Sequence, residues 1–234
     1  MFQYLARDSR LETFIYKATG LRLTRNLIQP TISTLRPGQT IFDHLTNLGA
    51  GIDAAAAQIL FPRMPTISSL TLYIDRNDDI VSQLALLPQL GRLCLVARAN
   101  VALTTHYLRG LQNLRLGMLE IYGEGGSDFN GLAITVNDID TVFGSHATLQ
   151  YLRVAWRGDT GPAGNLSFLQ YSPHLLVERV ITRYPALETL ELPDPCGVMN
   201  LRRLPALPLN SNVRYLSFKR IQAPRANMNT HGVR

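Results

Sequence analysis

The residue types that most often carry chemistry are dispersed along this 234-residue chain. Cys94 is a potential nucleophile, but spacing ties no histidine or carboxylate to it, so we expect an inert, exposed thiol. The histidines form no H-E-x-x-H motif and none lies at ligand spacing from a cysteine, so we expect no metal site. They are His44, His106, His146, His174 and His231.

Two further stretches hold suggestive residues without the rest of a motif. The glycine-rich stretch 122–131, YGEGGSDFNG, lacks the Gly-Lys-Ser/Thr ending and the G-x-G-x-x-G spacing of phosphate-binding loops, which favours an exposed turn. The Arg-Gly-Asp within residues 156–165, WRGDTGPAGN, is interpreted as part of a loop. Because G-x-S-x-G is also absent, we expect no catalytic residues, no cofactor and no enzymatic activity.

The formal net charge of +6 comes from the C-terminal end of the chain. No acidic residue follows Asp194, and the preceding part is close to neutral. A basic patch can bind nucleic acid, but a solvated tail is the simpler interpretation, so nucleic acid is kept as the alternative partner. The basic residues after Asp194 are Arg202, Arg203, Arg214, Lys219, Arg220, Arg225 and Arg234.

The amino-acid composition and the N-terminal residues limit which classes of protein this chain can belong to. With 46% hydrophobic and 17% charged residues, the chain has the composition of a globular domain. Two cysteines, Cys94 and Cys196, are too few for a disulfide scaffold. Arg7 interrupts any signal-peptide apolar region, and the most apolar window, 50–61, is far shorter than the about 20 residues a bilayer requires. We expect a soluble intracellular protein, cytoplasmic or nuclear, that does not bind membranes.

The apolar spacing L-x-x-L-x-L recurs along the chain at irregular steps, and such self-similarity is typical of repeat proteins. Its fourth and sixth positions point to one side of a strand and its third, fifth and seventh to the other. An eighth copy, Phe42, Leu45 and Asn47, matches the spacing less closely. The seven clear copies are Leu11/Phe14/Tyr16, Ile67/Leu70/Leu72, Leu90/Leu93/Leu95, Leu116/Leu119/Ile121, Leu149/Leu152/Val154, Leu187/Leu190/Leu192 and Val213/Leu216/Phe218.

Segments between these copies have helical character, as crossovers between parallel strands require. Helices are predicted over 53–61, 78–89, 135–147 and 172–186, from apolar spacing, acidic or capping residues at the start, and Pro62 and Pro185 as stops. Strand and helix in alternation predict an α/β solenoid. A doubly wound α/β domain is the alternative, although its central strands usually read as continuous apolar runs.

Three stretches, LPQLGRLCL, HATLQYLRVAW and YPALETLELP, each pass from a helix end through a turn into the apolar pattern. In this they resemble leucine-rich repeats, and more narrowly the irregular repeats of fungal F-box-type proteins, over about residues 9–220. The resemblance implies a curved parallel sheet on the concave side and helices on the convex side. In that family the F-box recruits a ubiquitin ligase and the repeats hold the substrate.

Two departures from the family pattern qualify this resemblance. Asp75, Arg98 and Glu124 stand where many such repeats place an Asn or Cys that satisfies the amides of the turn. Only ten residues precede Leu11, too few for an F-box, so we expect at most the substrate-recognition part. The domain prediction is one leucine-rich-repeat domain over 1–220, with about seven to eight repeats, followed by a basic, flexible tail over 221–234.

The outward strand positions are the candidate binding surface. Tyrosine and arginine are over-represented in protein interfaces, because each buries a large area and keeps a polar group. We therefore expect a non-enzymatic module that binds a protein ligand on its concave sheet; an α/β enzyme would instead need a pocket of clustered titratable groups. The predicted ligand-binding residues are Tyr73, Arg92, Glu120, Tyr122, Tyr151, Arg153, Glu191, Tyr215 and Lys219.

Overall fold

A computed structural model describes most of the repeat-bearing part of the chain. It covers residues 10–16, 22–36, 38–76, 78–98, 101, 103–124, 132–133, 147–157, 173–193 and 212–219. The helix predicted over 135–147 and the basic tail predicted over 221–234 lie outside the described residues, apart from Ala147.

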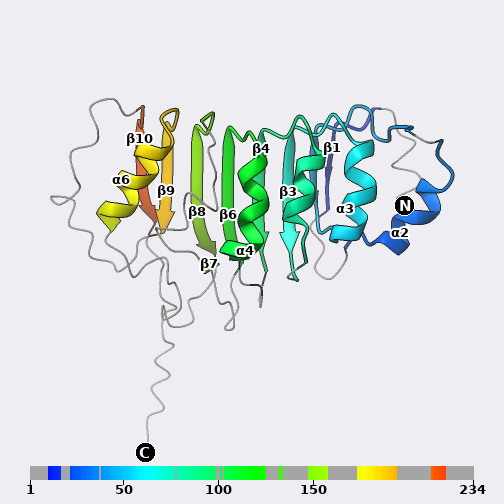
Figure 1. Ribbon diagram of the computed structural model, residues 1–234, viewed down its shortest axis with the longest axis horizontal. Coiled ribbons are helices and arrows are strands. Elements are labelled where there is room, and N and C mark those ends of the chain that lie inside the picture. The colour runs from blue at the N-terminus through cyan, green and yellow to red at the C-terminus, as the bar shows by residue number, and fades with distance from the viewer. Residues whose placement is uncertain are drawn as a thin grey trace, which may run out of the picture.

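One parallel sheet of eight strands organises the described residues (Figure 1). Every pairing in it is parallel, and the strands follow one another across the sheet in chain order. A doubly wound sheet reverses its strand order at a switch point, and the described strands show no reversal. The strands are β1 (Thr13–Ile15), β2 (Asn47–Ala50), β3 (Ser69–Ile74), β4 (Arg92–Ala97), β6 (Met118–Glu124), β8 (Tyr151–Arg157), β9 (Thr189–Pro193) and β10 (Tyr215–Lys219). A second, two-stranded parallel sheet joins β5 (Leu103–Thr104) to β7 (Leu132–Ala133).

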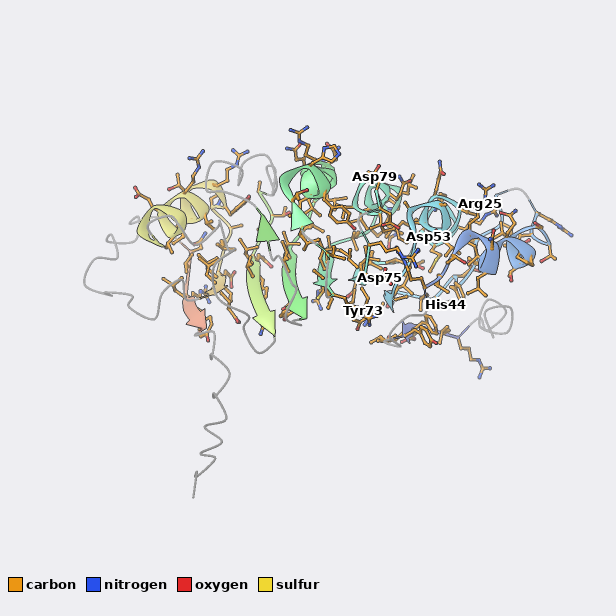
Figure 2. All side chains as sticks on the ribbon, turned by 90° about the horizontal axis from the view of Figure 1, so that it is seen from below. Arg25, His44, Asp53, Tyr73, Asp75 and Asp79 are labelled. Carbon is orange, nitrogen blue, oxygen red and sulfur yellow. The ribbon has the colours of Figure 1, made fainter. Side chains whose placement is uncertain are left out.

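Helices connect the strands, and α3, α4 and α6 lie along one side of the sheet (Figure 2). The helix predicted over 53–61 is confirmed as α3, which begins after Asp53, whose side chain accepts a hydrogen bond from the Ala56 amide at 2.6 Å. The helix predicted over 172–186 is α6, with Val180 and Ile181 buried as expected. The helices are α2 (Arg25–Ile32), α3 (Ala54–Leu60), α4 (Thr105–Leu108) and α6 (Pro173–Arg183), with 3₁₀ helices η1 (Phe61–Arg63), η2 (Val81–Leu86) and η3 (Arg109–Asn113).

The segment predicted as a helix over 78–89 forms only a 3₁₀ helix, η2. Its apolar side chains are still buried, as the helical spacing of Ile80 and Leu84 predicts. The tighter helix lies against η3, where a Cβ added to Gly110 would be 2.6 Å from the carbonyl oxygen of Val81. Short 3₁₀ helices are frequent as connectors, and η2 lies in the connection between β3 and β4.

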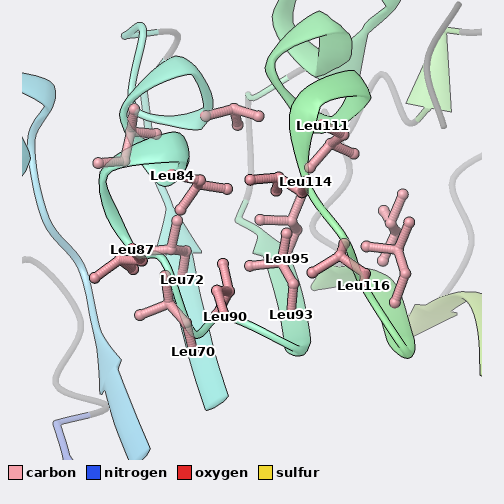
Figure 3. Packing of buried hydrophobic residues seen from close by; sticks show 14 of the residues in the cluster. Leu70, Leu72, Leu84, Leu87, Leu90, Leu93, Leu95, Leu111, Leu114 and Leu116 are labelled. Atoms are coloured by element: carbon pink, nitrogen blue, oxygen red, sulfur yellow. The ribbon is translucent and has the colours of Figure 1, made fainter. Parts of the chain in front are cut away.

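The core consists of the inward positions of the apolar pattern, packed between the sheet and the helices (Figure 3). Leu70 and Leu72 of β3 face Leu93 and Leu95 of β4 in register. The fourth and sixth positions are at most 2% exposed from β3 to β9, which confirms the alternation predicted from the sequence. Full burial of one such side chain is worth about 1.5–3 kcal/mol, so the repeated leucines are the main stabilising feature of the sheet.

The N-terminal copy Phe42/Leu45/Asn47 was assigned the wrong register by the sequence pattern. Phe14 of β1 pairs with Leu48, and Leu48 pairs with Leu70 of β3. The copy is therefore Leu45, Leu48 and Ala50, all buried. The sequence pattern gave the wrong register because the sixth position of this copy is the small residue Ala50 and not a large apolar one. Phe42, which has a positive φ of 55°, lies in the turn that precedes the copy.

A repeated backbone arrangement joins neighbouring strands just before they enter the sheet. The carbonyl oxygen at the second position of each copy accepts hydrogen bonds from the second and third amides of the next copy. For example, the Ser68 carbonyl accepts from Gly91 and Arg92, and the Glu188 carbonyl accepts from Arg214 and Tyr215. The same carbonyl ladder runs from Glu12 to Tyr215, and it holds all eight copies in one register.

Candidate functional site

The face of the sheet opposite α3, α4 and α6 presents the outward strand positions, and we call it the open face. Strand pairing places the fifth positions of six strands side by side across it. Neighbouring strands are about 4.8 Å apart, so consecutive members of this row are in reach of one another. The row reads Thr71, Cys94, Glu120, Arg153, Glu191 and Ser217.

Arg153 joins the predicted binding residues of three strands into one group. Its Nε lies 3.1 Å from Oε2 of Glu191 on β9, and its Nη1 lies 3.7 Å from Oε1 of Glu120 on β6. The same Nη1 donates a hydrogen bond to the phenol oxygen of Tyr122, and the guanidinium carbon lies 4.8 Å from the centre of that ring. The Tyr151 hydroxyl donates to Oε1 of Glu191 at 3.1 Å. We call Glu120, Tyr122, Tyr151, Arg153 and Glu191 the Arg153 cluster.

The charged members of the Arg153 cluster are shielded from solvent although they point away from the core. Their side chains are 20%, 14% and 12% exposed for Arg153, Glu120 and Glu191, respectively. Charges in such surroundings interact more strongly than charges in open water, because solvent screens them less. The cluster is thus a preformed polar centre on the open face.

The pKa values around the cluster reflect burial and negative charge. Burial, the hydrogen bond to Glu191 and the negative charge of Glu191 together raise the pKa of Tyr151 to about 12. Burial and the negative charge of Glu120 raise the pKa of Cys94 to about 12 and also raise that of Tyr122. Burial alone would lower the pKa of Arg153, but Tyr122 and Glu191 outweigh it and raise that pKa.

Cys94 is half-buried rather than exposed as predicted. Its raised pKa keeps the thiol protonated near neutral pH, and only the thiolate is a strong nucleophile. The arrangement offers ion pairs and hydrogen bonds rather than a reactive thiol near neutral pH.

The remaining predicted residues lie outside the Arg153 cluster. Tyr73 on β3 is only 7% exposed, and the guanidinium of Arg98 lies 4.8 Å from the centre of its ring. Arg92 on β4 is exposed, and Tyr215 on β10 is 51% exposed. Lys219 ends β10, but its side chain is outside the described part of the structure.

A second charged group was not anticipated from the sequence. Arg22, whose side chain is 7% exposed, contacts Asp75 at 2.9 Å and Asp78 at 2.7 Å, and donates to the Ile52 carbonyl at 3.0 Å. Asp75, labelled in Figure 2, stands where many leucine-rich repeats place an Asn or Cys. The unusual residue at position 75 was the one sign of this charged group in the sequence. Nothing in the sequence connected Asp75 to Arg22.

Burial and the negative charge of Asp78 raise the pKa of Tyr107, which follows β5 in the chain and belongs to α4. The hydroxyl of Tyr107 is buried and has no hydrogen-bond partner among the described residues. Arg22, Asp75, Asp78 and Tyr107 thus bring together residues that follow three different strands, β1, β3 and β5. We call these four residues the Arg22 cluster.

A hollow of about 280 Å³ lies between the turns that precede β4 and β6. Pro88, Gln89 and Asn113 contribute to its lining, and Arg115 is the one charged residue there. No group of three or more metal-ligating side chains occurs in the described ranges, and no helix there is long and apolar enough to cross a membrane. The clustered titratable groups are therefore on the open face and around Arg22, away from this hollow.

No family model matches the chain, and no curated protein matches it significantly.

Proposed function

We propose that the chain is a leucine-rich-repeat solenoid and a non-enzymatic interaction module that binds a protein ligand on its open, concave face. The observation that carries this proposal is the Arg153 cluster, which unites side chains of β6, β8 and β9 at one place on that face. The shared register and the carbonyl ladder support a repeat architecture, because each copy contacts the next in the same way.

The cluster has the properties of an interface anchor. Binding hot spots are enriched in Tyr and Arg and lie in well-packed, largely desolvated surroundings. Tyr151, Tyr122 and Arg153 are held by their neighbours in the free chain, so little additional ordering is needed when a ligand binds. Such preorganisation favours affinity.

A narrower proposal follows from the resemblance to F-box-type proteins. In that reading the ligand is a ubiquitylation substrate and the chain is the substrate-recognition part of a ubiquitin ligase. The three stretches LPQLGRLCL, HATLQYLRVAW and YPALETLELP are its support.

The test is to capture partners on the tagged chain from native lysate, at low and raised salt, and to titrate a purified candidate against variants. Tyr151→Ala and Arg92→Ala should each weaken binding by over about 1 kcal/mol, since both lie on the open face. Arg109→Ala, at an exposed position of η3, is the matched control and should bind as the wild type. Equal affinity of all three variants would contradict the proposal. Arg153→Ala is a poor test, because it removes the ion-pair partner that Glu120 and Glu191 share.

Nucleic-acid binding is the second candidate, favoured by the basic residues after Asp194. It predicts that captured RNA is lost steeply as salt rises and on deletion of residues 219–234, with the open-face variants unaffected.

A further inference from the structure

We propose that the two ends of the sheet bind each other between molecules, so that β10 of one copy of the chain pairs in parallel with β1 of a second copy. The occupant of each end is thus another molecule of the same chain, joined head to tail. The inference concerns the ends of the sheet and does not depend on which ligand the open face binds.

The first argument is the backbone of the two end strands. β1 and β10 are the outermost described strands of the eight-stranded sheet and lie at its opposite ends (Figure 1). An outermost strand presents amides and carbonyls that can pair with another chain. Within the chain, the Glu188 carbonyl accepts from the amides of Arg214 and Tyr215. The Arg214 carbonyl of one molecule would accept in the same way from the Glu12 and Thr13 amides of the next, which continues the carbonyl ladder.

The second argument is charge complementarity between the two ends. Glu12 and Arg214 occupy the second position of the first and last copies, and both side chains are exposed. If the register continues from molecule to molecule, Glu12 of one lies beside Arg214 of the next. Adjacent opposite charges favour strand pairing, and adjacent like charges oppose it. Pairing of two β1 edges, or of two β10 edges, would not bring Glu12 and Arg214 together.

The third argument is the apolar surface at both ends. Leu11 and Phe14 in the first copy, and Val213 and Leu216 in the last, are only partly buried. From β3 to β9, by contrast, the fourth and sixth positions are at most 2% exposed. Inside the sheet, each of these strands has a neighbouring strand on both sides. A second molecule would give β1 and β10 the missing neighbour, and burial of apolar surface favours association.

Two exposed side chains fit the same arrangement. Ile15 on β1 and Tyr215 on β10 are each 51% exposed. On the open face, a side chain at the third position reaches the fifth position of the next strand, since the Tyr151 hydroxyl donates to Glu191. Tyr215 holds the third position of β10 and Ile15 the fifth position of β1. The same relation across the junction would place the side chain of Tyr215 against Ile15.

The experiment is analytical ultracentrifugation of the full chain over a range of concentrations. Glu12→Arg and Arg214→Glu are measured separately and as an equimolar mixture. Ile15→Ser removes apolar surface at an exposed position without changing the charge. Glu178→Arg, at an exposed position of α6, is the matched control for a charge reversal away from both ends. Circular dichroism and thermal unfolding of each variant monitor folding.

The wild type should show a mass that rises with concentration, because one strand pair makes a small and therefore weak contact. Head-to-tail contacts leave an end free on each open assembly, so the mass should pass beyond that of a dimer. Glu178→Arg should associate as the wild type does.

Each charge reversal at an end places like charges at the junction and should raise the dissociation constant at least about 10-fold. The mixture of Glu12→Arg with Arg214→Glu should recover association, because each variant then meets the opposite charge on the other. Recovery would also show that both variants are folded. Ile15→Ser should weaken association without affecting the recovery.

Three results would overturn the inference. The first is a wild type that stays monomeric up to about 0.5 mM, where even weak contacts are populated. The second is association that neither charge variant changes. The third is a mixture of folded variants that does not recover association, which would refute the pairing of β10 with β1. Each of these results leaves the proposed binding of a protein ligand on the open face to its own test.

Discussion

Cys94 shows how burial and a charged neighbour together lower the reactivity of a side chain on the open face. Its pKa lies near 12 because of burial first and the charge of Glu120 second. Alkylation requires the thiolate, so at pH 8.5 iodoacetamide should label Cys94 at least about 100-fold more slowly in the folded chain than in urea. The rate should rise with pH up to about 12, because the thiolate fraction rises until the pH passes the pKa.

Glu120→Gln should lower the pKa of Cys94 and speed this labelling, since it removes a negative charge that disfavours the thiolate. Mass spectrometry of the peptide containing Cys94 measures the rate separately from that of Cys196. Glu178→Gln, on the exposed side of α6, is the matched control. If both variants react alike, Glu120 does not act on the thiol.

At this scale the sequence predicted which side chains share a face but not which touch. Alternation along a strand placed Glu120 and Arg153 outward, and both are outward. Their contact depends on the register between β6 and β8, two strands joined by a long connection whose path the local pattern does not define. The same holds for Arg22 and Asp75, which meet only because β1, β2 and β3 are neighbours.

Among the elements, the contact between η2 and η3 depends on a glycine. A Cβ at position 110 would lie 2.6 Å from the carbonyl oxygen of Val81, a backbone atom that cannot move aside without shifting η2. Gly110→Ala should therefore lower the free energy of unfolding by about 1–3 kcal/mol, as overpacking does. Urea unfolding followed by circular dichroism measures the change.

Gly91→Ala is the matched control for this substitution, because nothing lies within 4 Å of a Cβ at that position. Its effect on the free energy of unfolding should stay within about 0.5 kcal/mol. Equal destabilisation by both substitutions would mean that the close approach of η2 and η3 is not what Gly110 permits.

Element types were predictable where local signals agreed. Asp53 and the alanines after it specify α3, and the segment around Val180 specifies α6. The signals failed where packing outweighs local preference: η2 is compressed into a 3₁₀ helix against η3, and the copy at β2 uses Ala50 where a leucine was expected.

At the scale of the whole molecule, each described strand of the eight-stranded sheet pairs with the sheet strands that precede and follow it in the chain, so stability should be local. In repeat proteins, each unit is stabilised mainly by its neighbours. The Arg22 cluster ties together residues that follow β1, β3 and β5 at one end, and Arg22 also donates to the Ile52 carbonyl after β2. Removing one partner of a buried ion pair costs about 3–5 kcal/mol, so Arg22→Met should loosen that end selectively.

Amide hydrogen exchange tests this expectation. Arg22→Met should speed exchange in β1–β3 by about 100-fold or more and leave β8 and β9 unchanged. Arg25→Met, at an exposed position of α2, should have no such effect. Faster exchange in β8 and β9 to the same degree would show that the sheet opens as one unit.

The carbonyl ladder from Glu12 to Tyr215 sets the register of the strands through main-chain atoms alone. Outward side chains contribute nothing to these bonds, so their identities can change while the strand positions are retained. The sheet is thus suited to protein engineering: a library randomised at Ser69, Thr71 and Arg92 would vary specificity on a constant backbone. Glu120, Arg153 and Glu191 would have to be exchanged together, because Arg153 forms ion pairs with both glutamates.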